Sequence, residues 1–178
     1  MLTGIAQSGY EDATLLEIGC GVGHLHLHLL EQGARKAVGV DLAPAMIDEA
    51  RNWAAERGLS SRTEYHVGDF MHMQDIAPAD IMLMDKVICC YPDVDGLVHR
   101  SLAATRRVYA LVYPRNTWVM RSGVKLAGLV MRLIGSDFRP YVHDPEQVEQ
   151  WVRAAGFDKT YQNRTFIWLI QVYSRSAD

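Results

Sequence analysis

The chain has 178 residues, about the length of one domain, and 49% of them are hydrophobic while 22% are charged. These proportions are typical of a soluble globular protein and exclude a disordered, collagen-like or coiled-coil chain. Lysine and arginine number 18 and aspartate and glutamate 21, so the net charge is -3. This balance excludes a dedicated nucleic-acid binder but is compatible with a local basic patch.

The three cysteines predict a reducing compartment instead of a disulfide framework. Cys89 and Cys90 are neighbours, which rarely bridge, and Cys20 would be left over. The N-terminal residues show no basic region followed by an apolar one, and no apolar run reaches the ~18 residues of a membrane span. We therefore expect one cytoplasmic domain over residues 1–178, without stable membrane insertion.

A strand, a glycine loop and a helix come first along the chain. Residues 13–18 are a short apolar run that stops at Gly-Cys-Gly-Val-Gly, residues 19–23. Residues 24–30 alternate between histidine and leucine, a period that by itself favours a strand. We predict a helix instead, because a glycine loop after a buried strand usually leads into one. Val22, Leu25 and Leu29 would share its apolar face, and Gly33 would end it.

The same order of elements repeats up to residue 114. Strands are predicted at 37–41, 64–67, 80–85 and 107–113. Helices are predicted over 45–57, opened by Pro44, and from Asp93 or Asp95 to about residue 105. Strands separated by helices of this length indicate a doubly wound, mostly parallel α/β sheet with right-handed crossovers.

The last third departs from this alternation. Residues 118–134 predict a long, mostly apolar helix, and Asp144, Pro145 and Gln147 predict the start of a helix that runs to residue 155. Residues 157–161 and 165–173, joined by a turn at 162–164, predict an antiparallel hairpin. The predicted fold is therefore an α/β domain with a seven-stranded sheet that ends in a C-terminal antiparallel hairpin.

The glycine loop and the acid that ends the next strand indicate an adenosine-containing cofactor. The loop exposes backbone N–H groups, and Asp41 can accept both hydroxyls of a ribose. The third glycine comes one residue too early for a dinucleotide fingerprint. Glu17, two places before the loop, would repel a pyrophosphate and suit a cationic ligand.

Residues 17–23, Asp41 and Gly68-Asp69 together resemble class I S-adenosylmethionine-dependent methyltransferases. The resemblance extends from roughly residue 14 to residue 173 and includes the terminal hairpin. It implies S-adenosylmethionine as cofactor and a methyl transfer by direct in-line displacement. Only about a dozen residues precede the first strand, too few for the N-terminal helix that closes over the cofactor in that family. We therefore expect either a truncated chain or an unusually open site.

The resemblance also implies a role for each matching residue. The glycine loop would hold the methionine moiety, Asp41 the ribose diol and Asp69 the adenine amino group. Phe70 would flank the adenine ring, and Lys86 would lie beside the transferable methyl. The full expected set of cofactor-binding residues is Glu17, Gly19, Cys20, Gly21, Gly23, Asp41, Leu42, Met46, Asp69, Phe70, Asp85 and Lys86.

The acceptor is expected to be a small molecule. Residues 85–88 read Asp-Lys-Val-Ile, unlike the motifs of enzymes that methylate the amino groups of bases or glutamine, and no Pro-Cys nucleophile is present. The segment 115–142 carries a basic, apolar helix, which fits a solvated face, a substrate cap or a membrane-surface helix. A cap would favour an apolar, anionic acceptor, and Tyr91-Pro92 and residues 114–118 are similar to the magnesium-protoporphyrin O-methyltransferase branch.

Tyr91 and His143 are the expected catalytic or substrate-contacting groups, because both fall in loops at the carboxyl edge of the sheet. No metal is expected, since only His24 and His28 share a helical face and no third ligand accompanies them. Two other classes stay open: a nicotinamide-dependent oxidoreductase and a non-catalytic module of the same fold. The sequence leaves the oligomeric state open as well.

Overall fold

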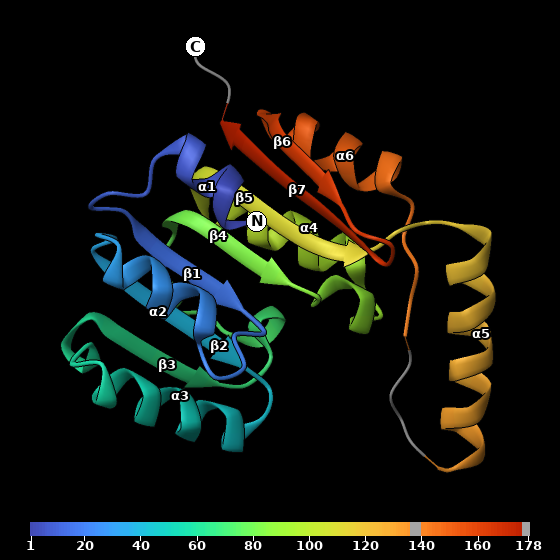
Figure 1. Cartoon of the computed structure of the whole chain (residues 1–178), viewed down its shortest axis with the longest axis horizontal. Coiled ribbons are helices and arrows are strands. Elements are labelled where there is room, and N and C mark those ends of the chain that lie inside the picture. The colour runs from blue at the N-terminus through green and yellow to red at the C-terminus, as the bar shows by residue number, and fades with distance from the viewer. Residues whose placement is uncertain (136–139, 176–178) are drawn as a thin grey trace.

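A seven-stranded sheet runs through the protein in the order β3-β2-β1-β4-β5-β7-β6 (Figure 1). The structure is a computed structural model that describes residues 1–135 and 140–175. The first five strands pair in parallel, and β7 pairs antiparallel with both β5 and β6. The strands are β1 (Thr14–Ile18), β2 (Lys36–Asp41), β3 (Thr63–Val67), β4 (Ala79–Asp85), β5 (Thr105–Pro114), β6 (Phe157–Arg164) and β7 (Trp168–Arg175).

Helices cover both faces of this sheet. One face carries α1 (Leu2–Ser8), α2 (His24–Glu31) and α3 (Pro44–Glu56), and the other carries α4 (Val94–Ala103) and α6 (Pro145–Ala154). A further helix, α5 (Trp118–Leu133), is described over its whole length, has no buried residue and stands apart from the sheet (Figure 1). Short 3-10 turns lie in the loops: η1 (Ser60–Arg62), η2 (Phe70–His72) and η3 (Ile88–Cys90).

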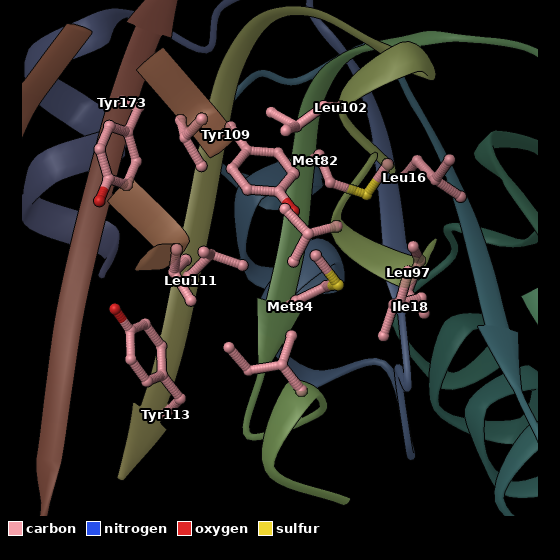
Figure 2. Close-up of a cluster of buried hydrophobic side chains, with 14 of the residues drawn as sticks. Leu16, Ile18, Met82, Met84, Leu97, Leu102, Tyr109, Leu111, Tyr113 and Tyr173 are labelled. Atoms are coloured by element: carbon pink, nitrogen blue, oxygen red, sulfur yellow. The ribbon is translucent and has the colours of Figure 1, made fainter. Parts of the chain in front are cut away.

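Each face of the sheet has its own apolar core, and β4 contributes to both. Met82 and Met84 lie in the core to which α4 and α6 contribute, and Figure 2 shows both side chains in this cluster. Ile81 and Leu83 lie in the core on the opposite face. Alternate side chains of a strand point to opposite faces. A strand covered on both sides is therefore apolar at almost every position, which explains the continuous apolar run of β4.

The predicted fold class is confirmed, and the helix predicted after the glycine loop forms despite its alternating sequence. The apolar face predicted for α2 is only partly confirmed, however. Leu27 and Leu30 are buried together with Leu29, whereas Leu25 is only partly covered. His26 is fully buried as well, and this polar residue on the inner face hid the helical period from a search based on hydrophobicity.

The hairpin forms, but its turn lies three residues later than predicted. The strands extend to Arg164 and begin again at Trp168, so residues 165–167 make the turn. The cause is that β6 is an edge strand whose last residues are polar and exposed. Gln162 still pairs with Gln171 across the ladder, and its Oε1 accepts a hydrogen bond of 3.0 Å from the Gln171 amide. The polar residues 162–164 therefore resemble a turn in the sequence, although they belong to a paired edge strand.

A helix also precedes β1, where none was expected. α1 is only seven residues long, and it packs closely because Gly4 lies against Tyr161 and Val172, where a Cβ atom would come within 2.7 Å of both side chains. Its buried Ile5 adds to the core beneath α2. The helix therefore packs on the C-terminal strands. This close packing holds α1 in place although it is only seven residues long.

Candidate active site

A cavity of about 230 Å³ opens at the carboxyl ends of β1, β2, β3 and β4. In the sheet order β3-β2-β1-β4, strands β1 and β4 are the pair from which the chain winds in opposite directions. Ligands of open α/β sheets bind at this switch point. The residues that line the cavity are Ile18, Gly19, Val40, Asp41, Leu42, Gly68, Asp69, Phe70, Asp85, Lys86, Val87, Cys90, Tyr91 and Leu97.

The glycine loop lets two segments approach each other at the floor of this cavity. Gly19 has a φ of +64°, and a Cβ atom there would lie 2.5 Å from Cγ2 of Val87. Only glycine meets both conditions without strain, because L-residues avoid this backbone region and the space is already filled. Gly21, with a φ of +52°, has open space where its Cβ atom would be. The two glycines therefore serve different purposes, close packing at Gly19 and backbone conformation at Gly21.

Asp41 is held in place by the backbone on both sides. Its Oδ2 accepts a 2.8 Å hydrogen bond from the amide of Gly21 in the glycine loop, and its Oδ1 accepts one of 2.9 Å from the amide of Ala43. A carboxylate oxygen can accept more than one bond, so each oxygen keeps capacity for a further donor. Asp41 thus lines the cavity as an oriented acceptor pair, the arrangement that a ribose diol requires.

Asp69 forms a second fixed carboxylate, at the end of β3. Its Oδ1 accepts from the amide of Met71, and its Oδ2 accepts from the hydroxyl of Tyr91 at 2.8 Å and lies 3.1 Å from Nδ1 of His72. Burial by itself would raise the pKa of Asp69, but these hydrogen bonds lower it below the ordinary value. Asp69 is therefore ionised at neutral pH and presents negative charge to the cavity.

Tyr91 belongs to the same cluster and not to a separate acceptor site. Burial and the hydrogen bond to Asp69 raise the pKa of Tyr91 to about 12. The phenol therefore keeps its proton at neutral pH and uses it to orient Asp69. The structure thus gives Tyr91 a place in the cavity with its hydroxyl bound to Asp69, and its catalytic role stays a prediction.

Lys86 follows β4 in a strained conformation between two hollows. Its φ is +62°, a region that residues other than glycine rarely enter and that clusters at functional sites. Its Nζ lies 3.1 Å from Oδ2 of Asp85 and 5.4 Å from the ring centre of Trp168. Asp85 and Lys86 line both the cavity and a second, more open hollow, which is otherwise bordered by Met1, Leu2, Thr3, Leu25, Val112, Thr165, Trp168 and Ile170.

Glu17 takes part in a buried chain of hydrogen bonds beneath the glycine loop. It is 2% exposed, and its Oε2 lies 2.6 Å from Nδ1 of His26, whose Nε2 lies 2.9 Å from the hydroxyl of Tyr65. Glu17 is not among the residues that line the cavity, and its predicted place near the cofactor, directly or through water, stays a prediction. The sequence held one sign that His26 could bind Glu17. His26 stands in the first turn of the helix that follows the glycine loop, and that loop directly follows β1.

His143 is not among the residues that line the cavity, and it binds the segment before α6 to η3. Its Nε2 donates a 2.7 Å hydrogen bond to the carbonyl of Ile88, and the amide of Tyr141 donates one of 2.7 Å to the carbonyl of Cys89. Burial lowers the pKa of His143 below its ordinary value, so the ring is neutral at pH 7. The proposed catalytic role of His143 has no support in this geometry, because its ring binds the backbone of η3.

The predicted cofactor residues divide into two groups. Those that line the cavity are Gly19, Asp41, Leu42, Asp69, Phe70, Asp85 and Lys86, and those that do not are Glu17, Cys20, Gly21, Gly23 and Met46. Cys20 is buried under the loop, where burial raises the pKa of its thiol. Ile18 and Gly68 belong to the motifs seen in the sequence, whereas sequence reasoning missed Val40, Val87, Cys90 and Leu97, which lie at the end of β2, after β4, in η3 and in α4.

A substrate cap is one of the three roles expected for the segment 115–142, of which residues 136–139 lie outside the described part of the chain. None of its described residues lines the cavity or the second hollow. In the parts of the chain that the structure describes, no three metal-binding side chains come together, and no helix is long and apolar enough to cross a membrane.

A known family matches this chain over the strands that build the cavity. Residues 15–112, more than half of the chain, match the family model described as a methyltransferase domain. The chain belongs to this family. The methyltransferase domain thus covers β1 to β5, including the glycine loop and both fixed carboxylates, and the resemblance seen in the sequence is confirmed as a class I S-adenosylmethionine-dependent methyltransferase domain.

Curated proteins that match most of the chain include two ribosomal protein L11 methyltransferases. The ribosomal protein L11 methyltransferase of Pasteurella multocida (strain Pm70) is 34% identical over 152 residues, which cover 82% of this chain and 45% of that protein. The enzyme of the same name from Yersinia pseudotuberculosis serotype IB (strain PB1/+) is 39% identical over 150 residues, with the same coverage. The chain therefore spans less than half the length of these relatives.

Solved structures show the same fold at low sequence identity. A magnesium protoporphyrin IX methyltransferase from Synechocystis PCC 6803 with bound SAH has a TM-score of 0.78 and 20% identity, over 96% of this chain and 78% of that one. The [4+2]-cyclase SpnF has a TM-score of 0.70 and 14% identity, over 94% and 76%. A cyclase among these methyltransferase-like structures shows that the fold alone does not determine the reaction.

Proposed function

We propose that the chain binds S-adenosylmethionine in the cavity at the carboxyl edge and transfers its methyl group to a small, apolar acceptor that carries an anionic group. The observation that supports the cofactor part of this proposal is the charge of the cavity. Asp41, Asp69 and Asp85 face it, and Lys86, the one lysine among the described residues that line it, is already paired with Asp85. Such a site suits a cationic, phosphate-free ligand and disfavours a pyrophosphate.

The residues present fit this cofactor part by part. Asp41 is oriented to accept from the two ribose hydroxyls, and Asp69 lies next to the apolar side chain of Phe70, where an adenine and its amino group would be held. Gly19 and Lys86 both line the cavity, and Gly19 presents no side chain to a methionine end held there. When bound, S-adenosylmethionine supplies an electrophilic methyl group on a sulfonium sulfur.

The chain's own contribution to the reaction is alignment and exclusion of water. In the displacement, the acceptor atom would form its bond to the methyl carbon as the carbon–sulfur bond breaks, and the electron pair of that bond would go to sulfur. A proton on the acceptor would be released to solvent once the product leaves the site, because the hydroxyl of Tyr91 donates to Asp69 and the ring of His143 donates to a carbonyl. Lys86, strained between cavity and hollow, is the group next to the transfer.

The second hollow supports the acceptor class. It shares Asp85 and Lys86 with the cavity, and its border is otherwise mostly apolar, with Leu2, Leu25 and Trp168. The ammonium of Lys86 lies against the indole ring, where it can meet an anionic group on a molecule that packs on that ring. The relatives named for ribosomal protein L11 make a protein acceptor the competing possibility.

Two titrations and one panel of acceptors test the proposal. Calorimetry should show binding of S-adenosylhomocysteine and none of NAD; the reverse would indicate an oxidoreductase, and binding of neither would indicate a non-catalytic module. Methyl transfer should then be measured with apolar carboxylates and phosphates, with cationic amines and with ribosomal protein L11. A preference for amines or for L11 contradicts the proposed acceptor class but not the proposed cofactor.

Two variants assign roles within this site. Lys86→Gln should raise KM for an anionic acceptor by about tenfold, since a charge-assisted contact is lost, whereas Lys36→Gln, on the distant end of β2, should not. Tyr91→Phe should weaken S-adenosylhomocysteine binding through Asp69 and leave kcat unchanged. A large fall of kcat in Tyr91→Phe would instead restore the phenol as a catalytic residue.

A further inference from the structure

The helix α5 exposes two kinds of side chain on neighbouring sides. Leu126, Leu129 and Leu133 are spaced by three and four residues, so they share one side, and they are 64%, 55% and 77% exposed. Val119 and Val130, both 46% exposed, widen this apolar side. An exposed apolar face of this extent is costly in water unless something covers it.

A cationic strip runs along the edge of this apolar side. Arg121, Lys125 and Arg132 are exposed and spaced by four and seven residues, which places them on one side of the helix. The sequence from 115 to 136 contains no aspartate or glutamate. None of the three cations pairs with an acidic side chain among the residues that the structure describes. The strip therefore offers its charge to a partner.

The tip of the terminal hairpin adds a second apolar element beside the start of α5. Phe166 and Ile167 in the β6–β7 turn are 80% and 40% exposed, and Trp118 at the start of α5 is 79% exposed. Arg115 ties the two together, because its amide donates 2.8 Å to the carbonyl of Ile167 and its Nη1 donates 3.2 Å to the carbonyl of Thr165. Figure 1 shows the chain leaving β5 for α5 alongside this turn.

We propose that α5 and the hairpin tip form a membrane-binding surface that docks on anionic lipid headgroups. An interfacial helix buries an apolar side at the boundary of headgroups and acyl chains, and its lysines and arginines meet anionic lipids. Trp118 and Phe166 supply the aromatic side chains that settle at this depth. The charge of the strip selects anionic lipids over neutral ones. This surface is separate from the cofactor cavity, so it stands independently of the proposed function.

The charges argue against a second copy of the chain as the occupant. Two copies that paired through α5 about a two-fold axis would present identical surfaces to each other. Because every charged side chain of α5 is positive, such a contact would bring Arg121, Lys125 and Arg132 toward the same residues of the second copy. The apolar contact would then be opposed by repulsion between like charges.

Flotation with lipid vesicles tests this surface with the whole chain. The protein should float with vesicles that contain phosphatidylglycerol, much less with vesicles of phosphatidylcholine alone, and less again when salt is raised. The variant Arg121→Gln/Lys125→Gln/Arg132→Gln should weaken binding about 100-fold, because each cation near an anionic surface contributes roughly a factor of five. The variant Leu126→Gln/Leu129→Gln/Leu133→Gln should abolish flotation.

A matched variant with the same loss of charge serves as control. Arg51→Gln/Arg57→Gln/Arg153→Gln removes three exposed or partly exposed cations from α3, its C-terminal end and α6, and it should float like the unaltered chain. All variants should bind S-adenosylhomocysteine equally, which shows that they are folded. Failure of the unaltered chain to float, or equal loss in the control, overturns the proposal. So does lipid-free self-association that the α5 variants abolish, which would make this face a dimer interface.

Discussion

The cofactor cavity and the helix α5 are held in opposite ways. In the cavity, Asp41 and Asp69 each receive bonds from backbone amides and rest on strands of the central sheet. In α5, every residue is at least partly exposed, and the Thr117 side chain caps its start. A site that must recognise one charged ligand is preorganised by its surroundings. A surface that docks on a membrane does not have to recognise one molecule, so a suitable pattern of charge and exposed apolar area is sufficient.

The buried support of the cavity should give the strongest response to mutation. Glu17→Ala leaves His26 buried without its carboxylate partner, and we expect the free energy of unfolding to fall by about 3 kcal/mol. Urea unfolding at neutral pH measures this. Glu64→Ala breaks the exposed pair with Lys36 and should cost less than about 1 kcal/mol. Equal losses in both variants would show that the buried chain is not what supports the loop.

Cofactor affinity should respond next most strongly. Asp41→Ala should weaken S-adenosylhomocysteine binding by about 2 kcal/mol, because the acceptors for the ribose are lost and the glycine loop loses its bond to the carboxylate. Calorimetry measures the affinity. Asp48→Ala, an exposed acid on α3, should bind normally. Unchanged affinity in a folded Asp41→Ala protein would place the ribose elsewhere.

Two glycines allow a comparison within the loop itself. Gly19→Ala combines a left-handed backbone with a collision against Val87 and should cost about 2 kcal/mol or more of stability, whereas Gly21→Ala suffers only the backbone penalty of about 1 kcal/mol. Thermal unfolding compares them. Adding Val87→Ala to Gly19→Ala should recover part of the loss. If Gly21→Ala is the more damaging variant, the packing seen at Gly19 is not what limits substitution.

The smallest expected effect is a pH dependence of the unfolding free energy that comes from His143, which lies between α5 and α6 and binds the carbonyl of Ile88. Because burial lowers the pKa of His143, the unfolded chain takes up a proton near pH 6.5 before the folded chain does. The stability contributed by His143 is therefore complete above pH 6.5 and declines as the pH falls toward the lower folded value. The difference in unfolding free energy between the unaltered chain and His143→Gln should shrink over that window, and a constant difference would contradict it. His24→Gln, at an exposed position, is the control.

Those parts of the protein that depend on short-range chemistry could be predicted from the sequence. Strands buried on both faces appear as apolar runs, glycines mark the loop, and acids at strand ends mark the carboxyl edge. The fold class, the cavity and residues such as Asp41 and Asp69 were predictable for this reason. The helix after the glycine loop is confirmed as well, because the loop outweighs the period of two in setting the conformation of residues 24–31.

The pairing of side chains far apart in the chain, by contrast, depended on the three-dimensional structure. The bonds from Glu17 to His26 and on to Tyr65, from Tyr91 to Asp69 and from His143 to Ile88 join different elements. Several polar groups could donate a hydrogen bond to a given carboxylate, and the group that does so is the one that the fold places next to it. The same holds for α5, since its composition is compatible with a solvated face, a substrate cap or a membrane-surface helix, and only the tertiary structure shows that it stands apart from the sheet with no buried residue.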